Sequence, residues 1–356
     1  MSTECAFHAV ARADTLPAVD EERAEYGLAV WSTPAWLAGA ESWMDGRLAE
    51  AGIERTGEVT QPHLRAWGTA LTAPTTRGPV WLKAPGPETA FEAALYELLG
   101  TVVPDRVLVP IAVDVPRGWI LLPDGGPTLR EHDDGSLLPA LEAILPRYAQ
   151  LQRDLESHVD KLVAFGVADM RAPAMPARFD EALAVARRYV TDHGTATDRT
   201  DLDRIAALRQ EFVAWCAELA ESPVPASLDH NDLHPGNVFE AGTRFYDWGD
   251  SVVAHPFASM LVTLGYLHSL FGPTAGPARV RDAYLEPFTD LAPRTALVAQ
   301  VELACRVAKA ARVLTWDRAL RAQGYSAAGE FGRAPLETLL NLRAPGWHSV
   351  GSGPQP

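Results

Sequence analysis

The sequence changes character at Asp124-Gly125-Gly126-Pro127, four turn-forming residues that interrupt any helix or strand. Before this break lie short β-like runs bounded by Pro and Gly, at residues 68–73, 79–84, 108–114 and 118–122. After it lie mostly helical patterns, at about 136–159, 177–192, 199–221, 256–271, 277–290 and 294–322. The break therefore predicts an α+β fold with a small β-rich N-lobe, a Gly-rich joint and a larger, mostly helical C-lobe. Such a joint is a natural place for a ligand cleft.

The chain divides into four parts along its length. These are residues 1–55 (an N-terminal helical extension), 56–123 (the N-lobe), 124–343 (the C-lobe) and 344–356 (a flexible tail rich in Pro, Gly and Ser). In the extension, Pro34 suits the first turn of a helix that runs to about Ala51. In the N-lobe, residues 87–99 carry an apolar stripe and form the one expected helix. In the C-lobe, residues 238–239 and 244–246 predict a small hairpin that turns at 241–242.

Composition describes an ordinary globular protein with an acidic character. Of 356 residues, 47% are hydrophobic and 22% are charged, and the net charge is −15. Nucleic acids and anionic membranes are bound by basic patches, so this charge argues against both as partners. The three cysteines include no Cys-x-x-Cys pair, which favours a reducing cytoplasm over a disulfide framework. Residues 252–271 are uncharged and long enough to span a bilayer, but their polar side chains favour a buried helix.

Two neighbouring segments carry the most informative chemistry. The first reads Leu-Asp-His-Asn-Asp-Leu-His-Pro-Gly-Asn-Val-Phe over 228–239, and the second reads Phe-Tyr-Asp-Trp-Gly-Asp over 245–250. Phosphoryl transfer uses a carboxylate to orient the acceptor hydroxyl, and Mg²⁺ with hard oxygen ligands to offset the triphosphate charge. Asp232 offers that carboxylate, and Asn237 and Asp247 offer amide and carboxylate oxygens at a suitable spacing.

These residues resemble the catalytic and metal loops of the aminoglycoside phosphotransferase family, which has a protein-kinase-like fold. The His-x-Asp-x-x-x-x-Asn pattern of that family is matched by His230, Asp232 and Asn237, and its following Asp-Trp/Phe-Gly-like element by Asp247-Trp248-Gly249. The resemblance spans roughly residues 60–320. It implies ATP-dependent transfer of the γ-phosphate to a hydroxyl of a small molecule, an antibiotic or a metabolite. It also implies that Asp232 is the catalytic base, that Asn237 and Asp247 hold Mg²⁺, and that His230 supports the loop.

The family also implies a lysine that grips the ATP phosphates and a helix glutamate that positions it. Lys83 ends an apolar strand, and lysine is scarce, because only Lys161 and Lys309 accompany it in the whole chain. Glu92 and Glu88 are both candidate partners for Lys83. Glu92 flanks the apolar stripe of the helix, whereas Glu88 follows Pro87 and suits the helix dipole. We favour Glu92 and keep Glu88 open.

The sequence gives weaker signals for the residues that contact adenine and for the loop that covers the phosphates. The strand that ends at Leu122 leads into Pro123 and Asp124, the expected hinge where backbone groups meet adenine. The Gly-x-Gly-x-x-Gly loop of protein kinases is missing, and the equivalent turn falls at residues 63–69. How the phosphates are covered, and whether ATP or GTP is preferred, stay open at this point.

The acceptor is expected to be a small hydroxylated molecule. Only about eight residues separate Asp247 from the next helix, too few for the activation segment of a protein kinase. The helices at 136–221 and 256–322 are expected to wall the acceptor pocket. Asp250, Trp248 and His255 are candidate substrate contacts near the metal loop. Each suits a structural role equally well: a turn cap, a core aromatic ring and a buried histidine.

Two other functions stay open from the sequence. His230, Asp232 and His234 alternate in a way that could bind zinc in a metal-dependent hydrolase. That alternative leaves Asn237 and Lys83 without a role. The second alternative is a catalytically silent nucleotide-binding protein with the kinase fold. No pattern in the sequence indicates the oligomeric state.

Overall fold

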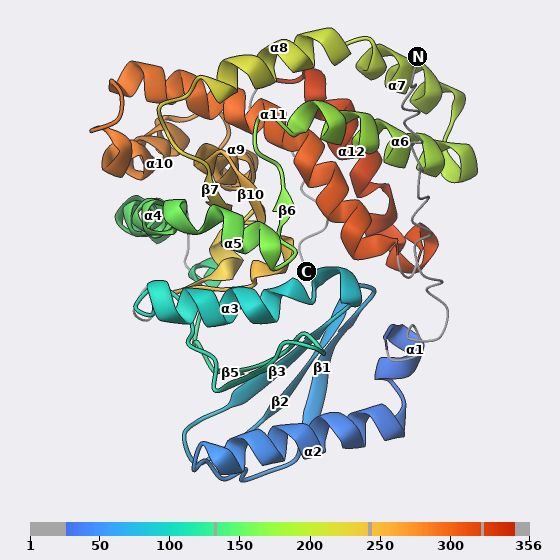
Figure 1. The fold of residues 1–356 in the computed structure, drawn as a ribbon, viewed down its shortest axis with the longest axis vertical. Coiled ribbons are helices and arrows are strands. Elements are labelled where there is room, and N and C mark those ends of the chain that lie inside the picture. Colours follow the sequence, from blue (N-terminus) through green and yellow to red (C-terminus); the bar gives the residue numbers. More distant parts are fainter. Residues whose placement is uncertain (1–25, 132–133, 241–243, 322–323, 346–356) are drawn as a thin grey trace, which may run out of the picture.

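The structure is a computed structural model that describes residues 26–131, 134–240, 244–321 and 324–345, and it has two lobes (Figure 1). The smaller lobe contains a five-stranded antiparallel sheet with strand order β1-β2-β3-β5-β4. The strands are β1 (Thr60–Arg65), β2 (Gly68–Ala73), β3 (Val80–Pro85), β4 (Ala112–Asp114) and β5 (Trp119–Pro123). Three helices accompany the sheet: α1 (Leu28–Trp31), α2 (Pro34–Glu50) and α3 (Phe91–Val102). In Figure 1, α2 and α3 lie on opposite sides of the sheet.

Side-chain alternation along the strands decides which residues face α2 and which face α3. On β5, Trp119 and Leu121 pack in the cluster that contains α2, whereas Ile120 and Leu122 join the core that contains α3. Lys83 on β3 is the register partner of Ile120, and cross-strand partners point to the same face. The strand pattern therefore directs Lys83 toward α3 and the larger lobe.

The larger lobe is built mainly from helices. They are α4 (Asp134–Leu155), α5 (Val159–Ala164), α6 (Met175–His193), α7 (Ala196–Ala206), α8 (Arg209–Ala220), α9 (Met260–Phe271), α10 (Ala275–Leu285), α11 (Arg294–Leu320) and α12 (Ala334–Leu340). A three-stranded sheet of order β6-β10-β7 lies among them, with β6 (Ala168–Asp169), β7 (Ser227–Asp229) and β10 (Val252–Ala254). A two-stranded hairpin pairs β8 (Val238–Phe239) with β9 (Arg244–Phe245).

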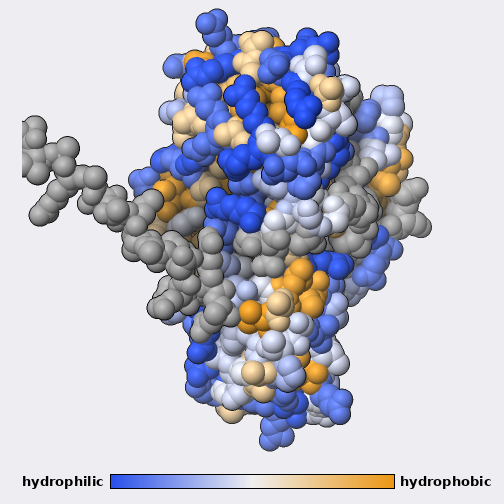
Figure 2. Space-filling view, turned by 90° about the vertical axis from the view of Figure 1, so that its right-hand side faces the viewer, coloured by the Kyte–Doolittle hydropathy of each residue, from blue (hydrophilic) through white to orange (hydrophobic). Residues whose placement is uncertain are grey.

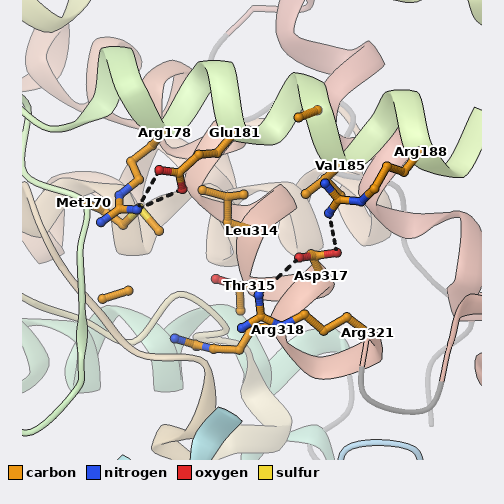
Figure 3. A pocket seen from close by; sticks show the side chains of 12 residues that line it. Met170, Arg178, Glu181, Val185, Arg188, Leu314, Thr315, Asp317, Arg318 and Arg321 are labelled. Atoms are coloured by element: carbon orange, nitrogen blue, oxygen red, sulfur yellow. Dashed lines mark hydrogen bonds and ion pairs between the residues drawn. The ribbon is translucent and has the colours of Figure 1, made fainter. Parts of the chain in front are cut away.

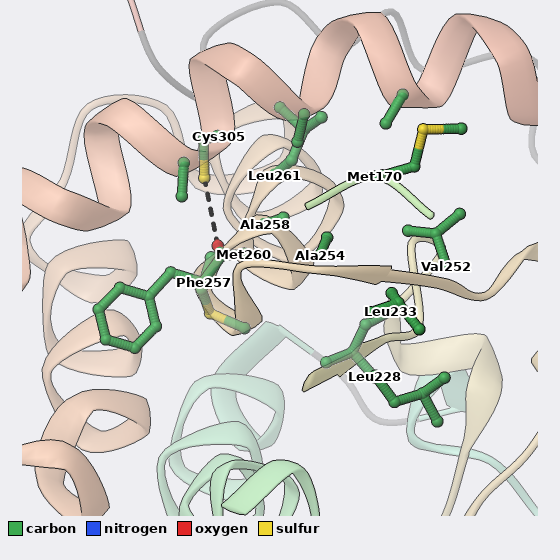
Figure 4. Close-up of a cluster of buried hydrophobic side chains, with 14 of the residues drawn as sticks. Met170, Leu228, Leu233, Val252, Ala254, Phe257, Ala258, Met260, Leu261 and Cys305 are labelled. Carbon is green, nitrogen blue, oxygen red and sulfur yellow. Dashed lines mark hydrogen bonds between the residues drawn. The ribbon is translucent and has the colours of Figure 1, made fainter. Parts of the chain in front are cut away.

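An apolar core underlies the loop that follows β7. Leu228 on β7 and Val252 on β10 meet Met260 on α9 in this cluster, and Cys305 on α11 donates to the Phe257 carbonyl oxygen at 3.7 Å (Figure 4). Leu233 also belongs to the cluster and is 1% exposed. Because Leu233 directly follows Asp232, its burial fixes the backbone beside that carboxylate.

The surface is mostly hydrophilic, and apolar residues form small separate patches in the face that Figure 2 shows. Across the described ranges, the exposed large apolar side chains are Val109, Val115 and Leu270. Within those same ranges, no helix combines the length and the apolar character needed to cross a membrane.

The arrangement of lobes agrees with the α+β, protein-kinase-like expectation, and several elements differ from it. The expected helix 199–221 is two helices, α7 and α8, because the chain turns at Ala207 and Leu208. The uncharged stretch 252–271 begins as strand β10 and becomes helical only from Pro256 onward. β1, β6 and α12 have no counterpart among the expected elements. The expected hairpin turn at 241–242, residues 1–25 of the extension and residues 346–356 of the tail lie outside the described residues.

Candidate active site

The loop after β7 is tied to the loop after β9 by His230. The Nε2 atom of this buried histidine lies 2.9 Å from the carbonyl oxygen of Tyr246, and its Nδ1 atom accepts from the Asp232 amide at 3.3 Å. A carbonyl oxygen only accepts, so Nε2 carries the proton and one neutral tautomer satisfies both contacts. Burial lowers the pKa of His230, which favours that neutral form. One contact is made by the Asp232 amide and the other by the residue before Asp247. His230 thus fixes the position of Asp232 relative to Asp247.

Asp232 and Asn237 face each other across the tight turn that His234 caps. The Asn237 Nδ2 atom donates to the Asp232 carbonyl oxygen at 2.9 Å, and the His234 side chain accepts from the Gly236 amide at 3.0 Å. The Asp232 side chain is 26% exposed, so its carboxylate can meet a ligand. Its two oxygens differ, because Oδ1 accepts from Arg312 at 2.6 Å while Oδ2 has contacts of 3.5 Å to Asn237 and 3.6 Å to His234.

Arg312 on α11 is a candidate site residue that no sequence motif indicates. Its guanidinium is 6% exposed and binds two carboxylates, Asp232 at 2.6 Å and Asp250 at 2.7 Å. It also donates to the Asn231 carbonyl oxygen at 2.7 Å. Burial lowers the pKa of Arg312, but the charges of Asp232 and Asp250 outweigh it and raise that pKa above the usual value. An arginine within an apolar helical stretch could have indicated a buried charge in the sequence. Its partners could not be predicted, because they lie 80 and 62 positions away in the chain.

Asp247 and Lys83 join the two lobes. Asp247 has the left-handed conformation, with φ 63° and ψ 61°, and its side chain is 47% exposed. Its carboxylate forms an ion pair with the Lys83 ammonium group of β3. Burial raises the pKa of Asp247, but the Lys83 charge more than offsets this and holds that pKa below its ordinary value. Asp247 is therefore ionised near neutral pH.

Glu92, and not Glu88, is the glutamate that contacts Lys83. The Glu92 carboxylate is fully buried on α3 and lies 2.7 Å from the Lys83 Nζ atom. Burial lowers the pKa of Lys83, but Asp247 and Glu92 together raise it well above its ordinary value, so the ammonium stays charged. Glu88 instead pairs with Arg321 of the other lobe. Gly249 leaves room for this cluster, because a Cβ atom there would lie 3.3 Å from Glu92 Oε2.

The donor set fits a hard divalent cation better than zinc. Asn237 and Asp247 offer an amide and a carboxylate oxygen, the ligand types that Mg²⁺ prefers together with phosphate and water. In the part of the chain that is described, no group of three or more His, Cys, Asp and Glu side chains is arranged to hold a metal ion. The zinc-hydrolase alternative for His230, Asp232 and His234 therefore has no support here, and His230 uses both ring nitrogens to hold backbone groups.

Two of the three expected substrate contacts belong to the core. Trp248 is fully buried, and its ring lies 4.7 Å from that of His230. His255 is 6% exposed and is held by Ser222 at 2.9 Å and by the Phe257 amide at 3.2 Å. Both side chains therefore have the structural roles that the sequence also allowed, a core aromatic ring and a buried histidine. Asp250 remains 29% exposed beside Asp232, joined to it through Arg312.

The hinge segment, Pro123 and Asp124, has no backbone amide hydrogen that is free to bind a ligand. Pro123 has no amide hydrogen, and the Asp124 amide donates to the Pro79 carbonyl oxygen at 3.1 Å. The Asp124 carboxylate accepts from the Gly126 amide at 3.3 Å and so closes the turn. Adenine recognition by this segment stays a prediction.

Comparisons with known proteins add the family and the fold. The profile of the phosphotransferase enzyme family (APH) matches residues 82–286. Among curated proteins, none matches the chain in sequence. The similar solved structures include an ethanolamine kinase from Plasmodium vivax, with a TM-score of 0.57 and 11% identity over 88% of this chain and 91% of that one.

Two further structures have the same fold. The choline kinase LicA from Streptococcus pneumoniae has a TM-score of 0.51 and 14% identity over 84% of this chain and 98% of that one. An amicoumacin kinase in complex with AMP-PNP and Ca²⁺ has a TM-score of 0.52 and 12% identity over 88% of this chain and 97% of that one. At these identities the structures show a shared protein-kinase-like fold, while the family match covers more than half of the residues. The chain therefore belongs to the phosphotransferase enzyme family, whose small-molecule kinases share its two-lobed fold.

Proposed function

We propose that this protein transfers the γ-phosphate of ATP to a hydroxyl group of a small molecule, with Asp232 as the catalytic base. The observation that carries the proposal is a pair of contacts, Asp232 with Asn237 and Asp247 with Lys83, whose loops His230 ties together. These four residues come from two loops and from a strand of the other lobe. Phosphoryl transfer depends mainly on positioning and on charge stabilisation, and this group supplies both.

Asp232 has one oxygen held and one oxygen available. Arg312 binds Oδ1 at 2.6 Å and fixes the orientation of the carboxylate. Oδ2 has only long contacts among the described residues, of 3.5 and 3.6 Å, and is the atom that can accept the hydroxyl proton of an acceptor. A positioned general base of this kind contributes about 10²-fold or more to a rate.

Nucleotide and metal binding fall to the neighbouring residues. Lys83 would contact the phosphates from the roof of the cleft, and Pro123 and Asp124 would border adenine. Asn237 and Asp247 would hold Mg²⁺, which offsets phosphate charge when it is bound. The bound AMP-PNP and Ca²⁺ in the amicoumacin kinase support the use of a nucleotide and a divalent cation. The buried free thiols of Cys216 and Cys305 suit the cytoplasm.

The test is a transfer assay over a panel of hydroxylated antibiotics and metabolites. Phosphate gain on the acceptor is detected by mass, and ATP consumption is followed in parallel. Asp232→Asn is expected to reduce the rate on the order of 10²-fold or more while ATP still binds, because the change removes the proton acceptor and keeps the shape. Asp201→Asn, a control on α7 beside Arg204, is expected to keep the wild-type rate.

Each alternative outcome has a distinct meaning. A folded Asp232→Asn variant that phosphorylates its acceptor at the wild-type rate would refute the role of Asp232. ATP binding without transfer to any acceptor in the panel would favour the catalytically silent nucleotide-binding protein.

A further inference from the structure

A cavity of about 340 Å³ lies between α6, α11 and the segment that contains β6 (Figure 3). This volume is within the range of small-molecule binding sites. The residues that line it are Ala168, Met170, Arg178, Glu181, Ala184, Val185, Arg188, Leu314, Thr315, Asp317, Arg318 and Arg321. We call this cavity the arginine pocket. It lies within the helices that the sequence marks as the walls of an acceptor site.

The arginine pocket adjoins the catalytic loops through one face of α11. Arg312, Thr315 and Arg318 follow one another at intervals of three residues, so they lie along the same side of the helix. Arg312 binds Asp232, as described above. Thr315 accepts from the Asn231 side chain at 2.6 Å, and Arg318 donates to the Gly249 carbonyl oxygen at 3.0 Å. Thr315 and Arg318 therefore contact the catalytic loops and also line the pocket.

The pocket is cationic in a strongly acidic protein. Four arginines and two carboxylates line it, a net charge of +2, whereas the whole chain carries −15. Three of the arginines have carboxylate partners. Arg178 pairs with Glu181 at 2.8 Å, Arg188 lies 3.6 Å from Asp317, and Arg321 pairs with Glu88.

Arg318 is the arginine whose charge is not neutralised. No carboxylate within the described ranges lies at ion-pair distance from it, and its Nε atom is buried without a hydrogen-bond partner. Its guanidinium lies over the Phe91 ring, 5.0 Å from the centroid, which holds it in place. A partly buried guanidinium with unused donors is a strong site for a carboxylate or a phosphate.

We propose that the arginine pocket binds an anionic group, a carboxylate or a phosphate, on the acceptor molecule, with Arg318 as its main donor. This proposal rests on the proposed phosphotransfer activity. Choline and ethanolamine, the substrates in the names of two similar structures, are cations. A cation would find both carboxylates of this pocket, Glu181 and Asp317, already paired with arginine. The structure thus favours a hydroxylated acid or a phosphorylated alcohol over an amine.

Binding measurements with matched probes test the proposal. D-gluconate and glucose 6-phosphate are the anionic probes, and glucose and glucosamine are their neutral and cationic counterparts. Titration calorimetry is run with AMP-PNP and Mg²⁺ present, so that Lys83 is covered by nucleotide. The proteins are the full-length wild type, Arg318→Met, Arg318→Lys and, as a control, Arg204→Met, whose exposed side chain lies on α7.

We expect at least one anionic probe to bind the wild type tenfold or more tightly than glucose and glucosamine. Arg318→Met is expected to lose this preference, Arg318→Lys to keep part of it, and Arg204→Met to keep all of it. The choice between gluconate and glucose 6-phosphate separates carboxylate from phosphate recognition. Tighter binding of glucosamine, equal binding of glucose, no binding of either anion, or unchanged anion binding in Arg318→Met would each overturn the proposal. If Arg318→Met does not fold, Arg318→Lys and the preference of the wild type decide the result.

A parallel transfer assay separates this proposal from the proposed function. Anion binding that depends on Arg318, without transfer of phosphate from ATP to any probe or panel compound, refutes the activity and supports the pocket. Transfer to amine-bearing acceptors in preference to acids supports the activity and refutes the pocket.

Discussion

Lys83 has an unusual setting for a lysine, because it contacts two carboxylates from different lobes. Glu92 is fully buried and lies 2.7 Å away, and Asp247 comes from the loop after β9. Burying Glu92 is costly unless its charge is paired, and burial indeed raises the pKa of Glu92 while Lys83 opposes that rise. The position of the lysine thus depends on carboxylates from both lobes.

Substitution of this ion pair is expected to weaken ATP binding. Lys83→Ala removes the proposed phosphate contact, and we expect an ATP affinity at least tenfold lower with little change in acceptor binding. Glu92→Gln leaves the lysine without its buried partner and is expected to lower the affinity in the same direction. Nucleotide titration monitored by calorimetry measures both effects.

Two matched variants control for the loss of charge alone. Lys161→Ala removes an exposed lysine, and Glu88→Gln removes the surface partner of Arg321. Surface ion pairs contribute about 0–1 kcal/mol, so both variants are expected to bind ATP nearly as the wild type does. Equal ATP affinities for Lys83→Ala and Lys161→Ala would show that Lys83 has no part in nucleotide binding.

At the scale of elements, His255 connects the end of α8 to the joint between β10 and α9. Ser222 donates to Gln300 Oε1 at 3.0 Å, so the Ser222 oxygen accepts from His255 Nε2 at 2.9 Å. His255 Nδ1 accepts from the Phe257 amide at 3.2 Å. The contact of Nδ1 needs the neutral ring, because a protonated Nδ1 cannot accept, and burial lowers the pKa of His255 from 6.5 to about 3. The unfolded chain therefore takes up this proton before the folded protein does as the pH falls.

This difference in the pKa of His255 between the folded and unfolded states predicts that the free energy of unfolding decreases as the pH falls. The contribution of His255 is fully present above pH 6.5 and is lost progressively as the pH falls toward 3. Between pH 7.5 and pH 5 the wild type is expected to lose about 2 kcal/mol through this group. Urea unfolding at the two pH values is expected to show a smaller pH dependence, by about that amount, for His255→Gln.

The comparison concerns the change with pH and not the stability at one pH, so a general loss of packing in His255→Gln does not affect it. His193→Gln, in an exposed position at the end of α6, is the control and is expected to keep the wild-type pH dependence. An identical pH dependence for His255→Gln and the wild type would mean that His255 does not stay neutral in the folded protein.

At the scale of the whole molecule, charged side chains join the two lobes. Lys83 pairs with Asp247, Glu88 pairs with Arg321, and Arg318 lies over Phe91. The contact of Lys83 with Asp247 is the one that includes a candidate metal ligand.

Activity is expected to require Mg²⁺ or Mn²⁺, because the two assigned protein ligands are both hard oxygen donors. Transfer is expected to stop in excess EDTA and to return when Mg²⁺ is added, whereas Zn²⁺ is not expected to restore it. The assay is the mass-detected phosphate transfer described above. Persistence of full activity in EDTA would contradict the assignment of Asn237 and Asp247.

Local patterns in the sequence determined the outline of this protein. The turn at Asp124–Pro127 separates a sheet-rich lobe from a helical one because Gly and Pro interrupt regular structure wherever they cluster. Asp232, Asn237 and Asp247 could be chosen as candidate site residues because their spacing and the turn between them are properties of one short stretch of chain. Lys83 could be placed on a strand face because side chains alternate there.

The tertiary structure alone decided which distant groups meet. Arg312 binds Asp232 across 80 positions, and the choice of Glu92 over Glu88 depends on how α3 packs against β3. Trp248 and His255 are buried although they lie close to Asp247 in the sequence, because closeness along the chain does not decide which side of a loop faces solvent. The arginine pocket likewise forms between α6 and α11, and the helical pattern of each segment does not predict that the two helices pack together. Local patterns report the preferences of neighbouring residues, whereas these pairings arise from packing between segments that are far apart in the chain.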